Sequence, residues 1–389
     1  MRADARGVAS ALALGAAIAS FGYTIFAVTR VLAFARRVDA QRERTRAASH
    51  GVSAAEDARL PSTTVLKPVR GVEPGLAGDL ASFCAQDYPA FDVVLGTLDP
   101  NDPAAGTLHA VASAGGERVR VVAGDGVPRH RNPKMSTLAP MLPFASGEIL
   151  VIADSDMRVT PDYLRAVAAA FADPAVGAVT CVYRGEPRAP GIAPALGALW
   201  ISEQFLPSVL VARIVEPMTY CFGGTMAVRR DVFDAIGGVD VLGRHLADDH
   251  ALGYLVAASG RRVALADYVV SAGVHDATVG GLLRHELRWA RTIRSLRPAS
   301  YAGVAIGFPV PLAVAALCLA RDRRIGSVVL AAATLARLAL HAAVRRVGGP
   351  PLPAWLIPLR DALGVGVWLG GFIGTTVRWR GAVLSTRTP

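Results

Sequence analysis

The sequence contains little cysteine, little charge and few aromatic residues. Its 389 residues include only four cysteines, which are scattered and form no Cys-x-x-Cys pair. A disulfide framework and a cysteine-rich zinc site are therefore not expected, and a reducing compartment fits. Charged residues make up 19% and hydrophobic residues 52%, which excludes an intrinsically disordered chain. The net charge of +10 is compatible with nucleic-acid binding, but an apolar basic chain is more typical of a membrane protein with basic cytoplasmic flanks.

A long uncharged run near the N-terminus predicts a membrane anchor. Residues 7–29 carry no charge, and a helix of that length would be about 35 Å long, enough to cross a bilayer core of about 30 Å. A cleaved signal peptide is the alternative. Arginines rather than a small-residue cleavage site follow the run, which favours a retained anchor. The arginine cluster at 36–46 then places the following residues in the cytoplasm.

Three further apolar segments are found near the C-terminus, at residues 301–320, 325–344 and 362–377. Gly366, Gly370 and Gly374 repeat every four residues in the third segment, a spacing that lets helices pack closely in lipid. Strict alternation of the segments would place the charges at 321–324 outside, against the positive-inside rule. One of the segments is therefore predicted to be re-entrant or interfacial.

The middle of the chain, residues 60–275, alternates strand-like and helix-like runs. Strands are predicted at 63–66, 92–97, 119–122 and 149–153, and helices at 76–86, 104–114, 135–144 and 161–171. This alternation predicts an α/β fold with a mostly parallel sheet covered on both faces. The stretch 42–58 is polar and alanine-rich, as in a linker or a surface helix.

Two aspartates follow the predicted strand at 149–153, in the motif Asp154-Ser155-Asp156. In extended backbone, residues two apart point the same way. Two carboxylates at the carboxyl end of a strand suit a hard divalent cation, which takes oxygen ligands and shares them with substrate phosphates. The alternative is a pair of solvated turn aspartates.

Further polar groups follow other predicted elements. Asp99 and Asp102 come directly after the strand at 92–97 and are either ordinary turn residues or contacts to the base or ribose of a nucleotide. Lys134 ends a basic turn at 130–134 that is either a phosphate contact or merely solvated. Asp248 and Asp249 open a predicted helix that runs to residue 258; they are either capping residues or include a general base for a hydroxyl group.

His285, Arg288 and Trp289 share one face of a predicted helix just before the C-terminal apolar segments. The sequence His-Glu-x-x begins like a zinc-protease motif, but Trp289 stands where the second histidine would be, so that interpretation fails. The helix also carries Arg284, Arg291 and Arg294. It is either an interfacial helix that binds anionic lipid headgroups, or a site where Arg288 holds a diphosphate and Trp289 stacks on a sugar ring.

The order and spacing of these motifs resemble the membrane-bound family 2/21 glycosyltransferases, closest to the ceramide glucosyltransferase-like branch that includes the hopanoid-biosynthesis-associated glycosyltransferases. The resemblance covers residues 63–297 and the layout of the anchors. The matching motifs, in chain order, are Lys67-Pro68, Gln86-Asp87-Tyr88-Pro89, residues 99–104, Asn132-Pro133-Lys134, Asp154-Ser155-Asp156, Phe222–Thr225, the acidic pair at 248–249 and Arg288-Trp289.

The resemblance implies a GT-A fold, in which a Rossmann-like mixed, mostly parallel sheet forms a catalytic domain flanked by transmembrane helices. It predicts an N-terminal transmembrane anchor at 1–35 and a linker at 36–60. A cytoplasmic catalytic domain that ends in an interfacial helix would follow at 61–298, and a C-terminal membrane region at 299–389.

The resemblance also implies roles for single residues. Asp102, with Asp99 nearby, matches the aspartate at the nucleotide. Asp154 and Asp156 match the motif that holds Mg²⁺ or Mn²⁺ and the diphosphate. Asp249 matches the catalytic base.

The remaining motifs match binding residues. Lys134 and Arg288 match groups at the nucleotide and its diphosphate. Trp289, Asp248 and His285 are predicted to contact the acceptor or the sugar. His285 stands where the family has glutamine or arginine, so its role stays open.

The function implied is the inverting transfer of one sugar from a UDP-sugar to a hydroxyl of a membrane lipid, on the cytoplasmic face of a bacterial inner membrane. Neither nucleic acid nor an obligate protein partner is expected. The alanine- and arginine-rich composition resembles that of high-GC bacteria and favours N-acetylglucosamine transfer to a hopanoid, bacteriohopanetetrol. Glucose transfer to ceramide is the alternative. A processive polysaccharide synthase and a non-enzymatic membrane protein rank lower.

Overall fold

The computed structural model describes residues 5–51, 57, 59–374, 376–379 and 382–385. The chain divides into two compact units. The sheet unit comprises residues 36–184 and 216–275, and the helical unit comprises residues 1–35, 185–215 and 276–389. Each unit is therefore assembled from stretches that are distant in the sequence.

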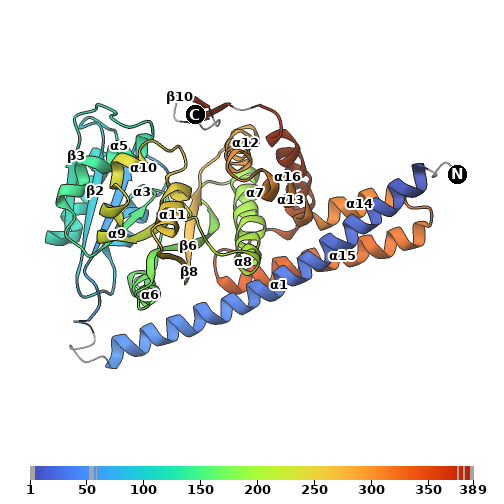
Figure 1. Cartoon of the computed structure of the whole chain (residues 1–389), viewed down its shortest axis with the longest axis horizontal. Helices are drawn as coiled ribbons and strands as arrows, with labels where there is room; N and C mark the ends of the chain where they lie inside the picture. The colour runs from blue at the N-terminus through green and yellow to red at the C-terminus, as the bar shows by residue number, and fades with distance from the viewer. Residues whose placement is uncertain (1–4, 52–56, 58, 375, 380–381, 386–389) are drawn as a thin grey trace. The chain divides into compact units, whose positions relative to one another are not determined.

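The sheet unit is built on an eight-stranded mixed sheet with the strand order β3-β2-β1-β4-β7-β6-β8-β5 (Figure 1). The strands are β1 (Thr63–Val69), β2 (Phe91–Thr97), β3 (Val119–Ala123), β4 (Ile149–Ala153), β5 (Met157–Arg158), β6 (Val176–Pro187), β7 (Thr225–Arg229) and β8 (Arg262–Val274). Neighbours are parallel from β3 to β4. β7 is antiparallel to both β4 and β6, and β5 is antiparallel to β8. The predicted α/β class with a mixed sheet is confirmed, and all four predicted strands are present.

The central strands β1 and β4 are buried along their whole length, as expected for parallel strands covered on both faces. Helices of the sheet unit are α3 (Leu76–Cys84), α4 (Ala105–Gly115), α5 (Pro133–Leu138), α6 (Tyr163–Ala170), α9 (Arg230–Ala235), α10 (Gly238–Leu242) and α11 (Asp248–Ala258), with 3-10 turns η1 (Gly116–Arg118) and η2 (Ala139–Phe144). The helix predicted at 135–144 changes to the 3-10 form at residue 139, where Pro140 and Pro143 lack the N–H groups that an α-helix needs.

The first helix, α1 (Ala5–Gly51), contains the predicted anchor at 7–29 and continues without a break to residue 51. At 47 residues it is about 70 Å long, which exceeds the thickness of a bilayer. The first part of the stretch predicted as a linker is thus helical. Residues 52–56 and 58 of that stretch lie outside the described part of the chain.

The helical unit contains an apolar segment that the sequence analysis missed. Between β6 and β7, α7 (Ile192–Trp200), a π-helical turn η3 (Ile201–Phe205) and α8 (Leu206–Val215) follow one another. Up to Ala212, the only charged side chain of this segment is Glu203. The low charge of this segment is visible in the sequence, but the segment falls within the catalytic domain predicted at 61–298.

The C-terminal elements are α12 (Val279–Leu296), α13 (Pro298–Gly303), η4 (Val304–Gly307), α14 (Pro309–Leu319), α15 (Arg323–Val344), η5 (Arg345–Val347), η6 (Ala354–Leu356) and α16 (Ile357–Gly371), followed by an antiparallel pair of β9 (Thr376–Trp379) and β10 (Ala382–Ser385). The third predicted apolar segment, 362–377, is shorter than expected, because α16 ends at residue 371 and β9 begins at 376.

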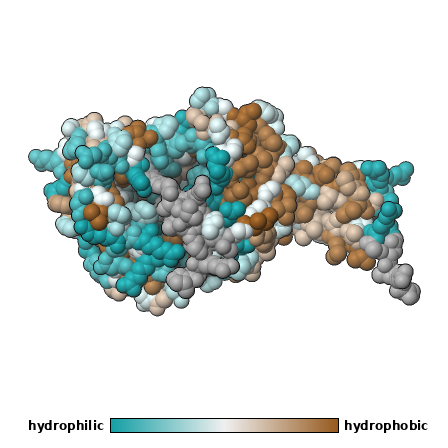
Figure 2. Space-filling view, turned by 90° about the horizontal axis from the view of Figure 1, so that it is seen from above, coloured by the Kyte–Doolittle hydropathy of each residue, from teal (hydrophilic) through white to brown (hydrophobic). Residues whose placement is uncertain are grey.

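Three helices of the described chain are long and apolar enough to cross a membrane: residues 6–47, 192–215 and 323–347. A fourth candidate is the pair formed by residues 298–307 and 309–319, which bends by 72° as in a broken span or a re-entrant loop. This bend agrees with the prediction that one of the C-terminal apolar segments is re-entrant or interfacial. Leu12, Val328 and Leu335 are about 70% exposed on these helices (70%, 69% and 68%). Figure 2 shows hydrophobic residues gathered on the helical unit, as expected for a surface in lipid.

Small residues allow close packing within the helical unit. Ala17 of α1 packs against Ala313 and Ala316 of α14 and Ala333 of α15. The predicted role of the glycine repeat is only partly correct. A Cβ atom on Gly370 would lie 2.9 Å from Leu287 of α12, but Gly366 faces open space and Gly374 lies beyond the end of the helix. Gly371 is not part of the repeat, but it is packed more tightly than Gly370, because a Cβ atom on it would overlap the Tyr301 hydroxyl.

Buried ion pairs tie these helices together. Glu203 of the π-helical turn accepts from Arg337 of α15 at 2.6 Å, and Arg337 also donates to Asp361 of α16 at 3.1 Å. Arg360 of α16 forms two hydrogen bonds of 2.7 and 2.9 Å with Glu286 of α12. All five side chains are buried, and a buried charge costs much free energy unless it is paired in this way.

Candidate functional site

The motif at residues 154–156 lies in a turn directly after β4. The backbone N–H of Met157 donates to the carbonyl oxygen of Asp154 at 3.3 Å, which closes the turn. The strand ends at residue 153 as predicted, but the prediction that the two aspartates lie in extended backbone is wrong, because they lie in this turn. Burial and the nearby charges of Asp154 and Glu73 raise the pKa of Asp156 to about 7. This acidic turn is thus an environment that favours a bound cation.

Lys67 lies beneath this turn. It belongs to β1, is fully buried, and donates to the carbonyl oxygens of Asp154 and, at 3.4 Å, of Met157. Its ammonium also lies 4.0 Å from the centre of the Phe83 ring. Burial lowers the pKa of Lys67 to about 8. From the sequence, Lys67 was predicted only as part of a family motif; its position inside an apolar strand is the signal that indicates a buried role.

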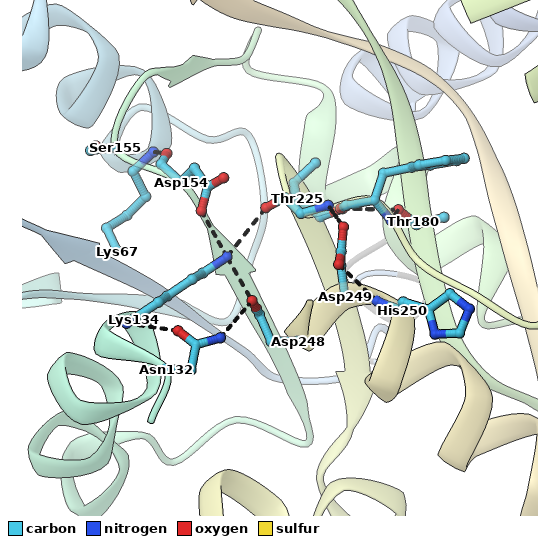
Figure 3. A network of polar contacts seen from close by, with 12 residues as sticks. Lys67, Asn132, Lys134, Asp154, Ser155, Thr180, Thr225, Asp248, Asp249 and His250 are labelled. Atoms are coloured by element: carbon cyan, nitrogen blue, oxygen red, sulfur yellow. Dashed lines mark hydrogen bonds and ion pairs between the residues drawn. The ribbon is translucent and has the colours of Figure 1, made fainter. Parts of the chain in front are cut away.

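Lys134 connects the acidic turn to the acidic pair of α11. Its Nζ atom lies 2.7 Å from Asp154 Oδ1 and 3.5 Å from Asp248 Oδ2 (Figure 3). Asn132, which caps α5, accepts from the Lys134 backbone N–H at 2.9 Å and donates to Asp248 Oδ1 at 3.0 Å. Burial lowers the pKa of Lys134, but the neighbouring carboxylates outweigh burial and hold the pKa above its usual range. The basic turn is therefore not merely solvated.

Asp249 lies in the first turn of α11, as predicted. Its Oδ2 atom accepts from the Gly223 N–H at 2.9 Å, and Oδ1 accepts from the His250 N–H at 2.8 Å. Burial and the adjacent Asp248 raise the pKa of Asp249 to about 6. A carboxylate with a raised pKa, fixed by two backbone donors, has the properties of a general base near neutral pH.

The Phe222–Thr225 motif forms the loop between these acidic groups. A Cβ atom on Gly223 would lie 3.3 Å from Asp249 Oδ2 and 3.9 Å from Asp154 Oδ2, so the carboxylates of two distant segments face the same small space. The loop is held by Thr180, whose hydroxyl accepts from the Phe222 N–H at 2.9 Å, and by the Gly224 carbonyl, which accepts from the Asp154 N–H at 3.1 Å. A side chain at residue 223 would crowd this space, which explains the glycine.

Asp99 and Asp102 both accept hydrogen bonds from main-chain N–H groups. Asp102 accepts from the Gly71 N–H at 2.9 Å and from the Ala104 N–H at 2.9 Å, which joins the loop after β1 to the start of α4. Asp99 is exposed and accepts from the Asn101 N–H at 2.8 Å, an ordinary turn contact. Their nucleotide role stays a prediction.

The remaining predicted residues lie on α12, in the helical unit. His285 Nδ1 lies 3.1 Å from Asp276 Oδ2, and its ring lies 4.3 Å from that of Trp289. Two of the arginines considered for lipid headgroup binding have partners within this unit, because Arg291 and Arg294 donate to the main-chain carbonyls of residues 372–376. Those two arginines are therefore not free headgroup ligands. The structure brings Lys134, Asp154, Asp248 and Asp249 together in one unit, and places His285, Arg288 and Trp289 in the other.

The donor set of the acidic turn fits Mg²⁺ or Mn²⁺. Asp154 is 40% exposed in its side chain and Asp156 is nearby, so one or two carboxylates are available. Among the described residues, no group of three or more His, Cys, Asp or Glu side chains is arranged to hold a metal. A cation bound here would complete its shell with water and substrate oxygens, as Mg²⁺ does in many phosphate-binding sites.

The sequence profile of Glycosyl transferase family 21 matches residues 16–388, and the chain belongs to this family. It is 21% identical over 244 residues to ceramide glucosyltransferase 1 of Caenorhabditis elegans, an alignment that covers 62% of this chain and 52% of that protein. It is 30% identical over 105 residues to the ceramide glucosyltransferase of Komagataella phaffii, covering 26% of this chain and 21% of that protein. The chain thus spans about half the length, or less, of these relatives.

Among solved structures, the chain is similar to the mannosyltransferase PcManGT from Pyrobaculum calidifontis in complex with GDP-Man and Mn²⁺. The identity is 20% and the TM-score is 0.49, and the match covers 92% of this chain and 98% of that one.

Proposed function

We propose that the protein is an inverting glycosyltransferase that moves one sugar from a UDP-sugar to a hydroxyl group of a membrane lipid. The observation that carries the proposal is the convergence of Asp154, Lys134 and Asp249 around Gly223 in the sheet unit. Family membership supports the reaction class, and the apolar helices support an acceptor embedded in lipid.

In the proposed reaction, Asp249 is the general base. Its two backbone donors orient the carboxylate, and each oxygen retains a lone pair that can accept the proton of the acceptor hydroxyl. The deprotonated hydroxyl oxygen attacks the anomeric carbon opposite the leaving UDP, so one displacement inverts the configuration. Its raised pKa makes Asp249 a stronger base than an ordinary carboxylate while it remains ionised at neutral pH.

The groups on the leaving side are cationic. A divalent cation at Asp154 and Asp156, when bound, would offset the charge that develops on UDP. Lys134, which lies beside Asp154, is proposed to add a positive charge at the diphosphate. Arg288 is proposed as a further diphosphate contact, Asp99 and Asp102 as nucleotide contacts, and Asp248, His285 and Trp289 as contacts to sugar or acceptor.

Ceramide is the better supported acceptor. The curated relatives described above are named ceramide glucosyltransferases, whereas the preference for a hopanoid that receives N-acetylglucosamine rested on composition. The proposal therefore places glucose transfer to ceramide, or to a lipid of similar polarity, first. The basic residues after the N-terminal apolar run favour a catalytic domain on the cytoplasmic face of the membrane.

The test uses the full chain, purified in detergent, with Mg²⁺ or Mn²⁺. UDP-glucose or UDP-N-acetylglucosamine is combined with ceramide or bacteriohopanetetrol, and the products are analysed by mass. A single hexose on ceramide supports the proposal, and an N-acetylhexosamine on the hopanoid restores the first prediction for the acceptor. Long sugar polymers would indicate a processive synthase. UDP binding without transfer to either lipid would exclude both acceptors, and no UDP binding would contradict the proposed UDP-sugar donor.

A further inference from the structure

The Lys134 ammonium lies among oxygen atoms from separate segments of the sheet unit. Its Nζ atom is 2.7 Å from Asp154 Oδ1, 3.5 Å from Asp248 Oδ2 and 3.3 Å from the Gly223 carbonyl oxygen (Figure 3). Only 11% of the side chain is exposed. A charged ammonium is thus held at the same carboxylate that the proposed function assigns to the divalent cation.

Asn132 holds both the Lys134 backbone and the Asp248 carboxylate in place. It is fully buried, its Oδ1 atom accepts from the Lys134 N–H, and its Nδ2 atom donates to Asp248. Pro133 at the first position of α5 further restricts the backbone that carries the lysine. The position of the ammonium is therefore set by buried packing, unlike that of a surface lysine.

A divalent cation bound by Asp154 would lie within a few ångströms of this ammonium. Two positive charges at such a distance repel each other, and the Lys134 side chain, which is only 11% exposed, is weakly screened by water. A diphosphate changes this balance, because its oxygens offer the lysine an anionic partner in place of the carboxylate and also supply ligands to the metal.

We propose that Lys134 competes with the divalent cation for Asp154 in the donor-free protein and passes to the diphosphate when the nucleotide binds. Metal and nucleotide then bind together rather than metal first. This inference rests on the proposed function, and it makes Lys134 a residue that sets the order of binding. Removal of the lysine charge should raise the affinity for the metal and lower the affinity for the nucleotide. A loss of folding would not produce these opposite effects.

The test measures Mn²⁺ binding to the full chain in detergent by the electron paramagnetic resonance signal of free Mn²⁺, without nucleotide. Lys134→Met is expected to bind Mn²⁺ about tenfold more tightly than wild type. In the presence of Mn²⁺ it is expected to bind UDP about tenfold more weakly. Lys134→Arg keeps the charge and should resemble wild type in Mn²⁺ affinity. Arg129→Met, which removes a positive charge from an exposed pair with Asp125, is the matched control and should change neither affinity.

Unchanged or weaker Mn²⁺ binding by Lys134→Met would overturn the inference. Thermal unfolding reports whether Lys134→Met is folded. If it is not, Lys134→Gln, which removes the charge and keeps a shorter polar side chain, is measured instead and judged by the same Mn²⁺ criterion. Tighter Mn²⁺ binding in a protein that binds no UDP would support the competition at Asp154 while contradicting the proposed function. Failure of the inference about Lys134 and failure of the proposed function therefore give different results.

Discussion

Replacing Asp249 by asparagine should make the protein more stable and inactive at the same time. The pKa of Asp249 is raised from 3.8 to about 6, and about two pKa units correspond to about 3 kcal/mol of cost to the ionised form. A carboxyl whose pKa is higher in the folded than in the unfolded protein binds more protons when folded. Its ionisation therefore lowers stability as the pH rises from about 4 through about 6.

Asparagine is neutral at every pH and avoids this cost. It also loses one of the two acceptors that receive the N–H groups of Gly223 and His250, at about 1 kcal/mol. The expected net gain is about 2 kcal/mol at pH 8 and none near pH 4. At pH 8 this would raise the unfolding temperature by a few degrees, which thermal unfolding in detergent can measure.

Turnover should fall by a factor of about 10²–10⁴, because the general base is lost. In the wild type, kcat/KM should decrease below about pH 6 as Asp249 becomes protonated. UDP binding should persist in the variant. Asp231→Asn, in the exposed first turn of α9, is the control and should change stability by less than about 0.5 kcal/mol. A stability gain that does not grow with pH, or turnover near that of wild type, would refute the reasoning.

Three further substitutions test the other contacts. Asp154→Asn should weaken Mn²⁺-dependent UDP binding about tenfold or more, measured by calorimetry; retained affinity would contradict the metal assignment. Lys67→Met removes the ammonium that contacts two carbonyl oxygens beneath the acidic turn and should lower stability by about 1–3 kcal/mol in thermal unfolding; a neutral result would argue against a structural role. Arg360→Met leaves Glu286 buried without its partner and should cost about 3–5 kcal/mol, whereas the added Glu286→Gln change should recover much of it. Equal stability of the single and double variants would contradict this coupling.

The elements of the sheet unit were largely predictable because their local signals agree with their tertiary surroundings. β4 is an apolar run that is buried along its length, and α11 opens on two aspartates, which favour the positive end of a helix. The irregular geometry of the acidic turn was not predictable. The end of the strand at residue 153 was predicted correctly, but the apolar pattern does not show whether the residues after a strand stay extended or form a turn, as residues 154–157 do.

The segment at 192–215 shows a different limit. It carries one charged side chain among its first 21 residues, yet along the sequence it stands between two strands of the sheet, β6 and β7. Its apolar composition indicates burial, but whether it is buried in the sheet or among other helices depends on its partners. The pairing of Glu203 with Arg337, 134 residues away, decides this.

The sequence by itself determined the apolar runs that become helices, the alternation that becomes an α/β sheet, and the residue types able to bind a cation or accept a proton. These properties depend on neighbours along the chain. Only the tertiary structure decided which charges meet. The Lys134 ammonium contacts carboxylates 20 and 114 residues further along the chain, and Lys67 reaches a carbonyl oxygen 87 residues away. Because the electrostatic free energy of a buried charge depends on distances in space, the raised pKa of Asp249 and the position of the lysine appear only when the segments are packed together.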